Sequence, residues 1–419
     1  MGKVSSSNSQ GVRVPKLRFP GFEGEWNRVL FSDLFAYLSN NTLSRAELSN
    51  SGKVRNIHYG DVLIKYGEVI VIEHTEIPYV ADVSRLRKPD YLSTGDVVIA
   101  DTAEDDTVGK AVEIINNSSV AVVSGLHTIP CRPKKRFVPS YLGYYVNSAP
   151  FHTQLHPYMQ GIKVTSISKG NIGKTYISSP DLEEQQKITS LLNLLSSRIE
   201  KQRQLVEALK SYKRGLSTAL FTRRIRIADA GESQLPEWKK RSLGEVFSER
   251  TERARGDEKL LAVTINNGVQ DRETLELKDN SSEDKTNYKV VHIGDLAYNS
   301  MRMWQGACGV SSYDGIVSPA YTVVFVVDPE MDYALFWGYY FKEISMLHTF
   351  QRNSQGLTSD TWNLKYDKFS KIIVNAPCLE EQVRIASLID HVSNAITVNE
   401  EVLDRLLNYK RGLLADMFI

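Results

Sequence analysis

The chain contains the six-residue stretch Pro180-Asp181-Leu182-Glu183-Glu184-Gln185 and repeats it, 197 positions later, as Pro377-Cys378-Leu379-Glu380-Glu381-Gln382. The same displacement carries Lys213-Arg214-Gly215-Leu216 onto Lys410-Arg411-Gly412-Leu413. Between these landmarks each copy predicts one long amphipathic helix, and a variable stretch of about 150 residues precedes each helix. A repeat on this scale decides the fold, because it indicates two similar halves, each a variable region followed by a helix.

Apolar residues in the first predicted helix recur at steps of three and four, which gives one continuous stripe, and every equivalent position in the second helix is also apolar. A helix with one apolar stripe needs a partner, and the obvious partner is the other copy. We therefore expect the helix pair or subunit contacts to involve Leu192, Leu195, Ile199, Gln202, Val206, Leu209, Leu216, Ile389, Val392, Ile396, Asn399, Leu403, Leu406 and Leu413.

Two features interrupt the apolar pattern of both helices. Gln202 and Asn399 stand at equivalent places in the stripes, where a polar residue can fix register and partner; alternatively, the stripe drifts and both side chains face water. Gly215 and Gly412 each cost about 1 kcal/mol against alanine inside a helix. Their presence in both copies indicates close approach of another backbone, from the paired helix or from another subunit.

The order of parts also bears on orientation. Pro180 and Pro377 end the preceding segments, and the glutamate pairs that follow lie in the first helical turn, where the helix dipole favours negative charge. Since each helix begins where its variable region ends, an antiparallel pair places the variable regions at opposite ends and creates an approximate two-fold axis. We predict the antiparallel arrangement.

Composition places the chain in an ordinary class. With 419 residues, 42% hydrophobic and 24% charged, it is long enough for two to four domains and typical of a globular protein. The longest apolar run, residues 320–327, is far shorter than a membrane span, and we find no secretory signal. Three widely spaced cysteines, Cys131, Cys308 and Cys378, favour a reducing compartment, so we expect a cytoplasmic protein. The net charge of +1 argues against coating nucleic acid by bulk charge.

The two variable regions share landmark residues, but the residues between these landmarks differ from one region to the other. Shared positions include Gly95-Asp96 with Gly294-Asp295, Gly143-Tyr144-Tyr145 with Gly338-Tyr339-Tyr340, and Gln160-Gly161 with Gln355-Gly356. By contrast, residues 100–106 (Ala-Asp-Thr-Ala-Glu-Asp-Asp) stand where the second copy has residues 298–304 (Tyr-Asn-Ser-Met-Arg-Met-Trp). Short β-branched runs predict strands at 69–72, 97–99, 120–123 and 321–327, and helices are predicted at 141–148 and 334–347. Each region is therefore expected to be a mixed α/β (α+β) domain.

This order of parts resembles the specificity (S) subunit of Type I restriction–modification systems, from about Val14 to Ile419. The resemblance implies a non-catalytic DNA-recognition subunit with two target-recognition domains, each reading one half of a bipartite, asymmetric site in double-stranded DNA. The paired helices would set the unread spacer. It further implies two modification (methyltransferase) subunits and, for cleavage, restriction subunits as partners. S-adenosylmethionine is then expected in the former and ATP in the latter, with no cofactor in this chain.

We accordingly expect a mixed α/β fold with two similar recognition domains joined by a pair of long antiparallel coiled-coil helices, related by a pseudo-two-fold axis. The expected parts are a disordered tail at 1–13, recognition domain 1 at 14–180, a spacer helix at 181–225, recognition domain 2 at 226–377 and a second spacer helix at 378–419.

Candidate DNA contacts follow from residue chemistry, since Lys, Arg and small polar groups bind phosphates while Arg, Asn, Gln, Asp and Glu read base edges. Any single candidate could equally be a solvated surface charge. In the first region the candidates are Lys53, Arg55, His58, Tyr59, Lys65, Arg85, Arg87 and Lys88, and in the second they are Arg250, Arg253, Arg255, Asn266, Asn267, Asn299, Arg302 and Trp304.

Two loops, residues 160–166 and 355–359, are stronger candidates because both copies keep a glycine followed by small hydroxyl side chains. Such loops bring backbone amides close to phosphate, so the shared loops should bind the DNA backbone rather than bases. Their candidate residues are Lys163, Thr165, Ser166, Gln355, Thr358 and Ser359.

The sequence contains only partial matches to known catalytic and ligand-binding motifs. Residues 170–175 end like a phosphate-binding loop but lack its first glycine and precede a strand pattern, and Glu276-Leu277-Lys278 is a chance-sized match to a nuclease motif. His152 and His156 have metal spacing, yet structural histidines are the better interpretation. No catalytic site is expected. The alternative function is a non-catalytic protein–protein scaffold with two α/β domains on a coiled coil.

The loop hypothesis makes a first prediction. Lys163→Ala should weaken binding to all DNA sequences alike and make the salt dependence of binding shallower by about one unit of slope, because one phosphate contact is lost. Titrations at several salt concentrations measure this, and a changed base preference with an unchanged slope would count against it.

Overall fold

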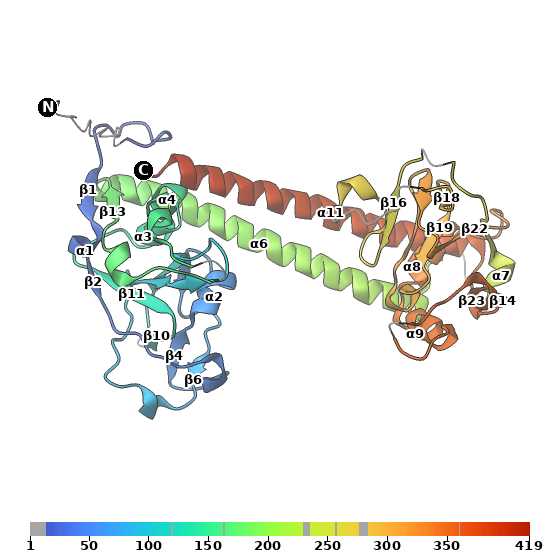
Figure 1. The fold of residues 1–419 in the computed structure, drawn as a ribbon, viewed down its shortest axis with the longest axis horizontal. Coiled ribbons are helices and arrows are strands. Elements are labelled where there is room, and N and C mark those ends of the chain that lie inside the picture. The colour runs from blue at the N-terminus through green and yellow to red at the C-terminus, as the bar shows by residue number, and fades with distance from the viewer. Residues whose placement is uncertain are drawn as a thin grey trace. The chain divides into compact units, whose positions relative to one another are not determined.

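The computed structural model describes residues 14–118, 120–161, 164–228, 235–255, 258–275, 284–359 and 361–419 (Figure 1). The expected tail at 1–13, Lys163 and the Glu276-Leu277-Lys278 match lie outside these residues. The described chain forms two compact units. Unit 1 holds the residues up to Arg203 together with Glu401–Ile419, and unit 2 holds Gln204–Glu400.

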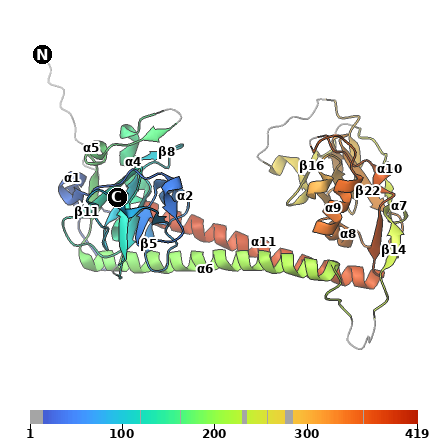
Figure 2. The same cartoon turned by 90° about the horizontal axis from the view of Figure 1, so that it is seen from below.

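Two long helices, α6 (Leu182–Phe221) and α11 (Leu379–Asp416), each contribute one end to each unit. In unit 1 the start of α6 packs against the end of α11, with Leu192 and Leu413 in one core. In unit 2 the end of α6 packs against the start of α11, with Leu220 and Ile389 in one core. The start of each helix thus meets the end of the other, so the helices are antiparallel as predicted, and both views show them side by side (Figures 1 and 2).

Unit 1 is a mixed α/β domain on the start of α6 and the end of α11. Its helices are α1 (Phe31–Leu34), α2 (Tyr59–Ile64), α3 (Tyr141–Val146), α4 (Ala149–Leu155) and α5 (Lys169–Ile172). Its strands are β1 (Asn27–Leu30), β2 (Phe35–Tyr37), β3 (Leu48–Ser49), β4 (Val54–Ile57), β5 (Val69–Val71), β6 (Tyr79–Val80), β7 (Val97–Ala100), β8 (Thr102–Ala103), β9 (Ala111–Ile115), β10 (Ala121–Ser124), β11 (Thr128–Pro133), β12 (Thr165–Ser166) and β13 (Tyr176–Ser179).

Unit 2 is built in the same way. Its shorter helices are α7 (Leu243–Val246), α8 (Ala334–Tyr340), α9 (Ile344–Asn353) and α10 (Tyr366–Phe369). Its strands are β14 (Lys239–Ser242), β15 (Phe247–Glu249), β16 (Leu261–Thr264), β17 (Gly268–Asp271), β18 (Lys289–Val291), β19 (Leu296–Asn299), β20 (Cys308–Val310), β21 (Gly315–Val317), β22 (Tyr321–Val326) and β23 (Ile373–Ala376). The single helix predicted at 334–347 is instead two helices, because Glu343 adopts an extended backbone (φ −72°, ψ 142°) between them.

The sheets show that the variable regions share one frame. Unit 1 orders its main sheet β2-β11-β7-β9-β5, and unit 2 orders its main sheet β15-β22-β19-β20, which repeats the first four positions. A separate two-stranded ladder joins the start and the end of each domain, β1 with β13 and β14 with β23. Strand β5, parallel to β9, is an addition of unit 1. The four predicted strands are all present, within one residue at either end.

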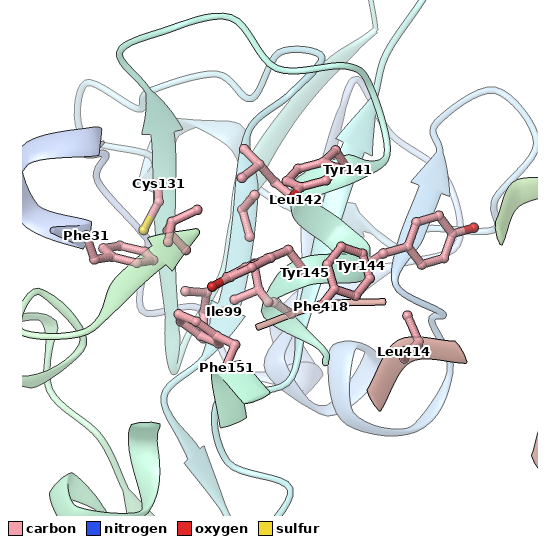
Figure 3. Packing of buried hydrophobic residues seen from close by; sticks show 14 of the residues in the cluster. Phe31, Ile99, Cys131, Tyr141, Leu142, Tyr144, Tyr145, Phe151, Leu414 and Phe418 are labelled. Carbon is pink, nitrogen blue, oxygen red and sulfur yellow. The ribbon is translucent and has the colours of Figure 1, made fainter. Parts of the chain in front are cut away.

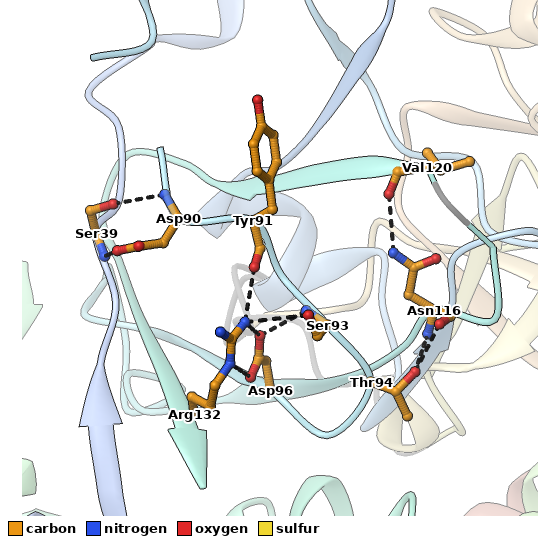
Figure 4. Close-up of polar contacts among 9 residues, drawn as sticks. All are labelled: Ser39, Asp90, Tyr91, Ser93, Thr94, Asp96, Asn116, Val120 and Arg132. Atoms are coloured by element: carbon orange, nitrogen blue, oxygen red, sulfur yellow. Dashed lines mark hydrogen bonds and ion pairs between the residues drawn. The ribbon is translucent and has the colours of Figure 1, made fainter. Parts of the chain in front are cut away.

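The aspartate of each shared Gly-Asp landmark is a buried carboxylate paired with a partly exposed arginine. Gly95 and Gly294 have φ of +92° and +91°, a conformation that glycine adopts without steric cost. In unit 1 the next residue, Asp96, is 1% exposed and receives Nε and Nη2 of Arg132 at 2.8 and 2.7 Å (Figure 4). In unit 2 the Asp295 carboxylate accepts hydrogen bonds from Nε and Nη2 of Arg250 in the same bidentate way. A buried carboxylate of this kind requires its arginine, so the landmark is structural.

A second repeated ion pair explains the Glu-Glu-Gln sequence at the helix starts. The carboxylate of Glu184 accepts Nε and Nη2 of Arg18, both at 2.8 Å, and Glu381 accepts Nε and Nη2 of Arg226 at 3.0 and 2.6 Å. Both glutamates are almost fully buried, at 1% and 0% exposure. Each arginine also donates to backbone carbonyls of the segment that enters its domain. The repeated motif thus ties the entrance of each domain to its own helix.

The glutamine of the motif ties the helix to the loop before α3 or α8. Gln185 accepts the backbone N–H of Val138 and donates to the carbonyl of Pro180. Gln382 accepts the backbone N–H of Tyr333 and donates to the carbonyl of Pro377.

The far end of each helix enters the core of the opposite domain. In unit 1 the ring of Phe418, just past α11, lies edge-on to Trp26, Tyr141 and Tyr145, with centroids 6.4, 5.7 and 5.6 Å away (Figure 3). Its equivalent at the end of α6, Phe221, packs in unit 2 against a corresponding set of rings, those of Phe336 and Tyr340.

A tyrosine in each unit joins the domain to both helices. The Tyr144 hydroxyl donates to Asn193 on α6, and Lys410 of α11 lies 5.4 Å from the Tyr144 ring centroid. In unit 2 the Tyr339 hydroxyl donates to Asp390 on α11, and Lys213 of α6 lies 5.8 Å from its ring centroid. The lysine of the Lys-Arg-Gly-Leu landmark therefore has a structural partner in each unit.

The helix seam agrees only in part with the expectations. Gln202 is 6% exposed, so for this residue the alternative that it faces water is wrong, while Asn399 is half-buried and donates to the Ala395 carbonyl. Gly215 and Gly412 are exposed, and a Cβ at either would meet no described atom within 4 Å. The paired helix therefore does not explain these glycines, because it does not approach them. The interpretation through another subunit stays a prediction.

The other helix residues expected in contacts are distributed as follows. Leu192, Leu195, Ile199, Val206, Ile389, Ile396 and Leu413 are buried, and Leu209, Leu216, Val392, Leu403 and Leu406 are half-buried.

The aromatic insertion makes a stability prediction. Phe418→Ala should destabilise unit 1 by about 3–5 kcal/mol, because it leaves a cavity among three aromatic side chains. Hydrogen exchange of α3 and β13 should rise accordingly. The matched control is Tyr409→Ala, whose side chain is 59% exposed on the same helix and whose loss should change stability by less than about 0.5 kcal/mol. Equal effects of the two changes would contradict the insertion.

Candidate nucleic-acid interface

In unit 1 the fold brings the variable segment after β7 beside the shared loop at 160–166. Strand β8 pairs with β12, with Thr102 opposite Ser166 and Ala103 opposite Thr165. The loop closes on itself through two backbone bonds between Gln160 and Ser166, 3.0 and 2.8 Å long. We call tip 1 the surface formed by residues 101–103, His127, Gln160, Gly161 and residues 164–166.

Unit 2 repeats this juxtaposition with other residues. The backbone N–H of Leu364 donates to the Ser300 carbonyl at 2.8 Å, and Gln355 and Asn363 exchange two backbone hydrogen bonds. The rings of Trp304 and Trp362 meet edge to face with centroids 5.1 Å apart. We call tip 2 the surface formed by residues 299–304, residues 355–359 and Trp362.

The equivalent hydrogen bonds refine the alignment of the tips. Ile167 donates its N–H to the Asp101 carbonyl, as Leu364 does to that of Ser300. Asp101 therefore corresponds to Ser300. The sequence comparison, which sets residues 100–106 against 298–304, places Asp101 opposite Asn299, one residue too early. The reason is that unit 1 has the longer segment between this anchor and the following glycine, Gly109 or Gly306.

Both shared loops require their glycine. Gly161 and Gly356 have φ of +119° and +139°, which residues with a Cβ rarely adopt. A Cβ at Gly161 would lie 1.9 Å from the Val164 carbonyl oxygen, and one at Gly356 would lie 2.5 Å from that of Thr361. In the second loop, Thr358 and Thr361 bond each other through backbone and hydroxyl groups.

Tip 1 presents a polar cluster that the sequence did not indicate. His127 has a left-handed backbone (φ +54°), and its Nδ1 lies 3.3 Å from Oδ1 of Asp101. The Thr102 hydroxyl donates to the same carboxylate oxygen at 2.8 Å. The ring of Tyr59 meets that of His127 edge-on at 5.3 Å. A strained non-glycine residue in a polar cluster is often functional, and that strain is visible only in the structure.

Tip 2 presents a different surface. Asn299 accepts the backbone N–H of Met301 through its side chain, and Trp304 donates from Nε1 to the Met301 carbonyl. Leu357 is fully exposed and Met301 is 41% exposed. Arg302 is exposed on the same loop. Trp362, like His127 in tip 1, was missed by the sequence reasoning because only the fold brings it to the tip, whereas Asp101 and Thr102 lie in the stretch 100–106 that the sequence marked as differing between the copies.

Several predicted basic residues are engaged within their own unit. Arg55 donates to the carbonyls of Ile72 and Thr75, Lys65 pairs with Glu76, and Arg85 pairs with Glu47. In unit 2, Arg250 is held by Asp295, and Arg253 donates to the Asn287 carbonyl at 2.7 Å. Arg55 and Arg250 are thereby held within their units, whereas the pairs of Lys65 and Arg85 lie at the surface and contribute little to stability.

His58 caps a helix. Its Nδ1 accepts the Gly60 N–H at the start of α2, and burial, followed by the charge of Arg45, lowers the pKa of the imidazole. A buried neutral histidine of this kind is a structural residue.

The remaining candidates are distributed over the surface. Lys53, Arg87, Lys88, Arg255, Asn266 and Asn267 are exposed and lie outside both tips, while Tyr59, Thr165, Ser166, Asn299, Arg302, Trp304, Gln355, Thr358 and Ser359 lie on or against a tip. The two histidines with metal spacing have other contacts: Nε2 of His152 lies 3.0 Å from the Val108 carbonyl oxygen, and the His156 ring stands edge-on to that of His152.

Family comparison matches both halves of the chain. A family model described as the Type I restriction modification DNA specificity domain matches residues 23–210 and, a second time, residues 236–408. The chain belongs to this family. Such a specificity subunit is a non-catalytic part of a Type I restriction–modification system, and its role in DNA target recognition follows from the family.

Individual relatives are distant. The putative type I restriction enzyme MjaX specificity subunit of Methanocaldococcus jannaschii is 24% identical over 178 residues, which are 42% of this chain and only 40% of that protein. The crystal structure of the Type I S subunit from M. genitalium matches with a TM-score of 0.57 at 13% identity, over 97% of this chain and 99% of that one. A chain from a study of complex assembly and conformational transition of the type I R–M system matches with a TM-score of 0.51 at 16% identity, over 94% and 97%. At these identities the likeness shows that the chain shares the fold of these structures.

Among the residues that the structure describes, no helix combines the length and the hydropathy of a membrane span.

The loop geometry yields a prediction. Gly356→Ala should distort the loop, because a Cβ there requires an unfavourable φ and overlaps Thr361. Hydrogen exchange of residues 355–364 should rise while the core of unit 2 keeps its protection. Gly67→Ala is the control, since a Cβ at Gly67 meets no described atom within 4 Å and its φ is not in the positive region. Unchanged exchange at the loop would show that the glycine is dispensable.

Proposed function

We propose that this specificity subunit reads a bipartite, asymmetric target in double-stranded DNA, with tip 1 on one half-site and tip 2 on the other. In this proposal it directs methylation by bound modification subunits and, together with restriction subunits, cleavage. S-adenosylmethionine belongs to the modification subunits and ATP to the restriction subunits, and the complex acts in the cytoplasm.

One observation carries the proposal: in each tip, on the same sheet frame, a shared loop lies beside a variable segment that differs between the units. A feature common to two readers of different sequences suits the DNA backbone, which is the same everywhere. The small hydroxyl side chains of Thr165 and Ser166, and of Thr358 and Ser359, fit phosphate contacts. Features that differ between the readers, such as Asp101 in tip 1 and Arg302 in tip 2, suit base edges, which differ from site to site.

The helices support the partner part of the proposal. Gly215 and Gly412 are exposed in equivalent places, with room around each for another backbone. Three residues before each glycine, on the same helix face, stands an exposed tyrosine, Tyr212 or Tyr409, at 57% and 59% exposure. Aromatic side chains are enriched at protein interfaces. Two equivalent docking places fit two modification subunits.

The deciding experiment is selection from a random duplex pool by the purified chain bound to its modification subunits. The proposal expects a motif of two short specified blocks around an unspecified spacer. A pool that shows no enrichment, while the complex still forms, would favour the alternative of a protein–protein scaffold.

A spacer prediction follows from the helices. Deleting seven residues from the middle of each, around Arg203 in α6 and Glu400 in α11, removes two turns and about 10 Å while keeping each helix face in register. The selected spacer should shorten by about three base pairs, at 3.4 Å per pair. Deleting four residues from one helix only is the contrasting variant, since it shifts one stripe against the other. An unchanged spacer in the seven-residue variant would refute the ruler role of the helices.

A further inference from the structure

We propose that Arg302 reads a guanine in the half-site bound by unit 2. This inference rests on the proposed function and adds to it the identity of one base and the side chain that selects it.

The backbone of Arg302 is fixed while its side chain stays available. The Arg302 N–H donates to the Asn299 carbonyl at 3.0 Å, and the Arg302 carbonyl accepts the N–H of Gln305 and of Ala307. The next residue, Met303, is fully buried in the core of unit 2. The guanidinium itself is exposed, and within the described part of the chain no hydrogen bond or ion pair engages it. Because the backbone of Arg302 is already fixed and its guanidinium has no other partner among the residues that the structure describes, less conformational entropy is lost when the side chain binds DNA.

Arg302 differs in this from the other arginine candidates of unit 2. Arg250 is held by the buried Asp295, and Arg253 donates to the Asn287 carbonyl. Arg255 is exposed but lies outside tip 2. Arg302 is thus the arginine among these candidates that combines a place on the tip with an unused guanidinium.

The comparison with tip 1 argues for a base rather than a phosphate as the target. Between the anchor at Asp101 and the turn at Gly109, unit 1 carries Glu104, Asp105 and Asp106, all exposed. Carboxylates are repelled by phosphates, so this segment of unit 1 does not place its carboxylates against the DNA backbone. The equivalent segment of unit 2, which carries Arg302, leaves the shared frame at the equivalent anchor, Ser300, and in our proposal it faces the groove, where the bases differ.

The hydrogen-bonding geometry of the Arg302 guanidinium favours guanine over the other bases. The planar guanidinium fork matches O6 and N7 of guanine in a bidentate contact, which is the commonest specific contact between proteins and DNA. The surroundings strengthen it, since the exposed Leu357 and Met301 and the Trp304–Trp362 pair give tip 2 an apolar surface that displaces water. Electrostatic and hydrogen-bond terms are larger where water is excluded.

The test uses the full chain bound to its modification subunits. Selection from a random duplex pool first defines the motif of the wild-type complex. Binding is then measured on the selected site and on every single base-pair replacement of it, for wild type, Arg302→Ala, Arg302→Lys and the control Lys240→Ala. The control removes one exposed positive charge from β14 of the same unit, which lies outside the tip.

Arg302→Ala should lose about 5- to 150-fold discrimination at one G·C pair of one half-site and keep the preferences of the other half-site. Arg302→Lys, which keeps the charge but not the fork, should bind with closer to wild-type affinity and still discriminate poorly. Lys240→Ala should keep the whole motif.

Two results overturn the inference: an Arg302→Ala motif identical to that of wild type, or loss of affinity spread evenly over all positions, which would make Arg302 a phosphate contact. If the wild-type complex selects no split motif at all, the proposed function itself fails, so the two failures are distinguishable.

Discussion

The structure depends on an exchange of helix ends between the two repeats. Phe418, at the end of the second helix, completes the aromatic core of unit 1, and Phe221, at the end of the first helix, completes that of unit 2. A domain alone with its own helix would expose these rings, and burying an aromatic side chain contributes several kcal/mol. Antiparallel pairing is therefore imposed by the cores of the domains as well as by the apolar stripes.

Around these cores, buried ion pairs set where each domain joins its helix. The carboxylates of Glu184 and Glu381 are almost completely buried, while Arg18 and Arg226 keep 14% and 23% of their side chains exposed. The net stabilisation of such a pair is small, but leaving the buried glutamate without its arginine would be costly. Each pair joins the entrance segment of its domain to the start of the helix.

The same frame then carries two unlike surfaces. Sheet order, the Gly-Asp turn and the glycine of the shared loop are common to both units, whereas tip 1 is a polar cluster around His127 and tip 2 is an apolar surface with Arg302. Such a division lets a tip change without disturbing the core, because the anchoring hydrogen bonds at Asp101 and Ser300 use backbone atoms.

Much of this was readable before the structure, since apolar periodicity predicted both helices and the β-branched runs predicted strands. The failures have physical causes. The glycines of the helices look like packing sites in sequence, yet face open space. Arg55 and Arg250 look like free charges, yet are held by carbonyls or a carboxylate, because a sequence does not show which groups satisfy one another. The helix predicted at 334–347 breaks at Glu343, whose extended backbone a continuous apolar pattern does not reveal.

By itself, the sequence determined the duplication, the length and apolar stripe of each helix, and the family, because these depend on local periodicity and on repeated motifs. Only the tertiary structure decided which surfaces form the tips. His127 and Trp362 reach their tips through contacts with residues far away in the chain, and no local signal marks them. Long-range packing places side chains from separate segments on one surface, and that placement decides what the chain can recognise.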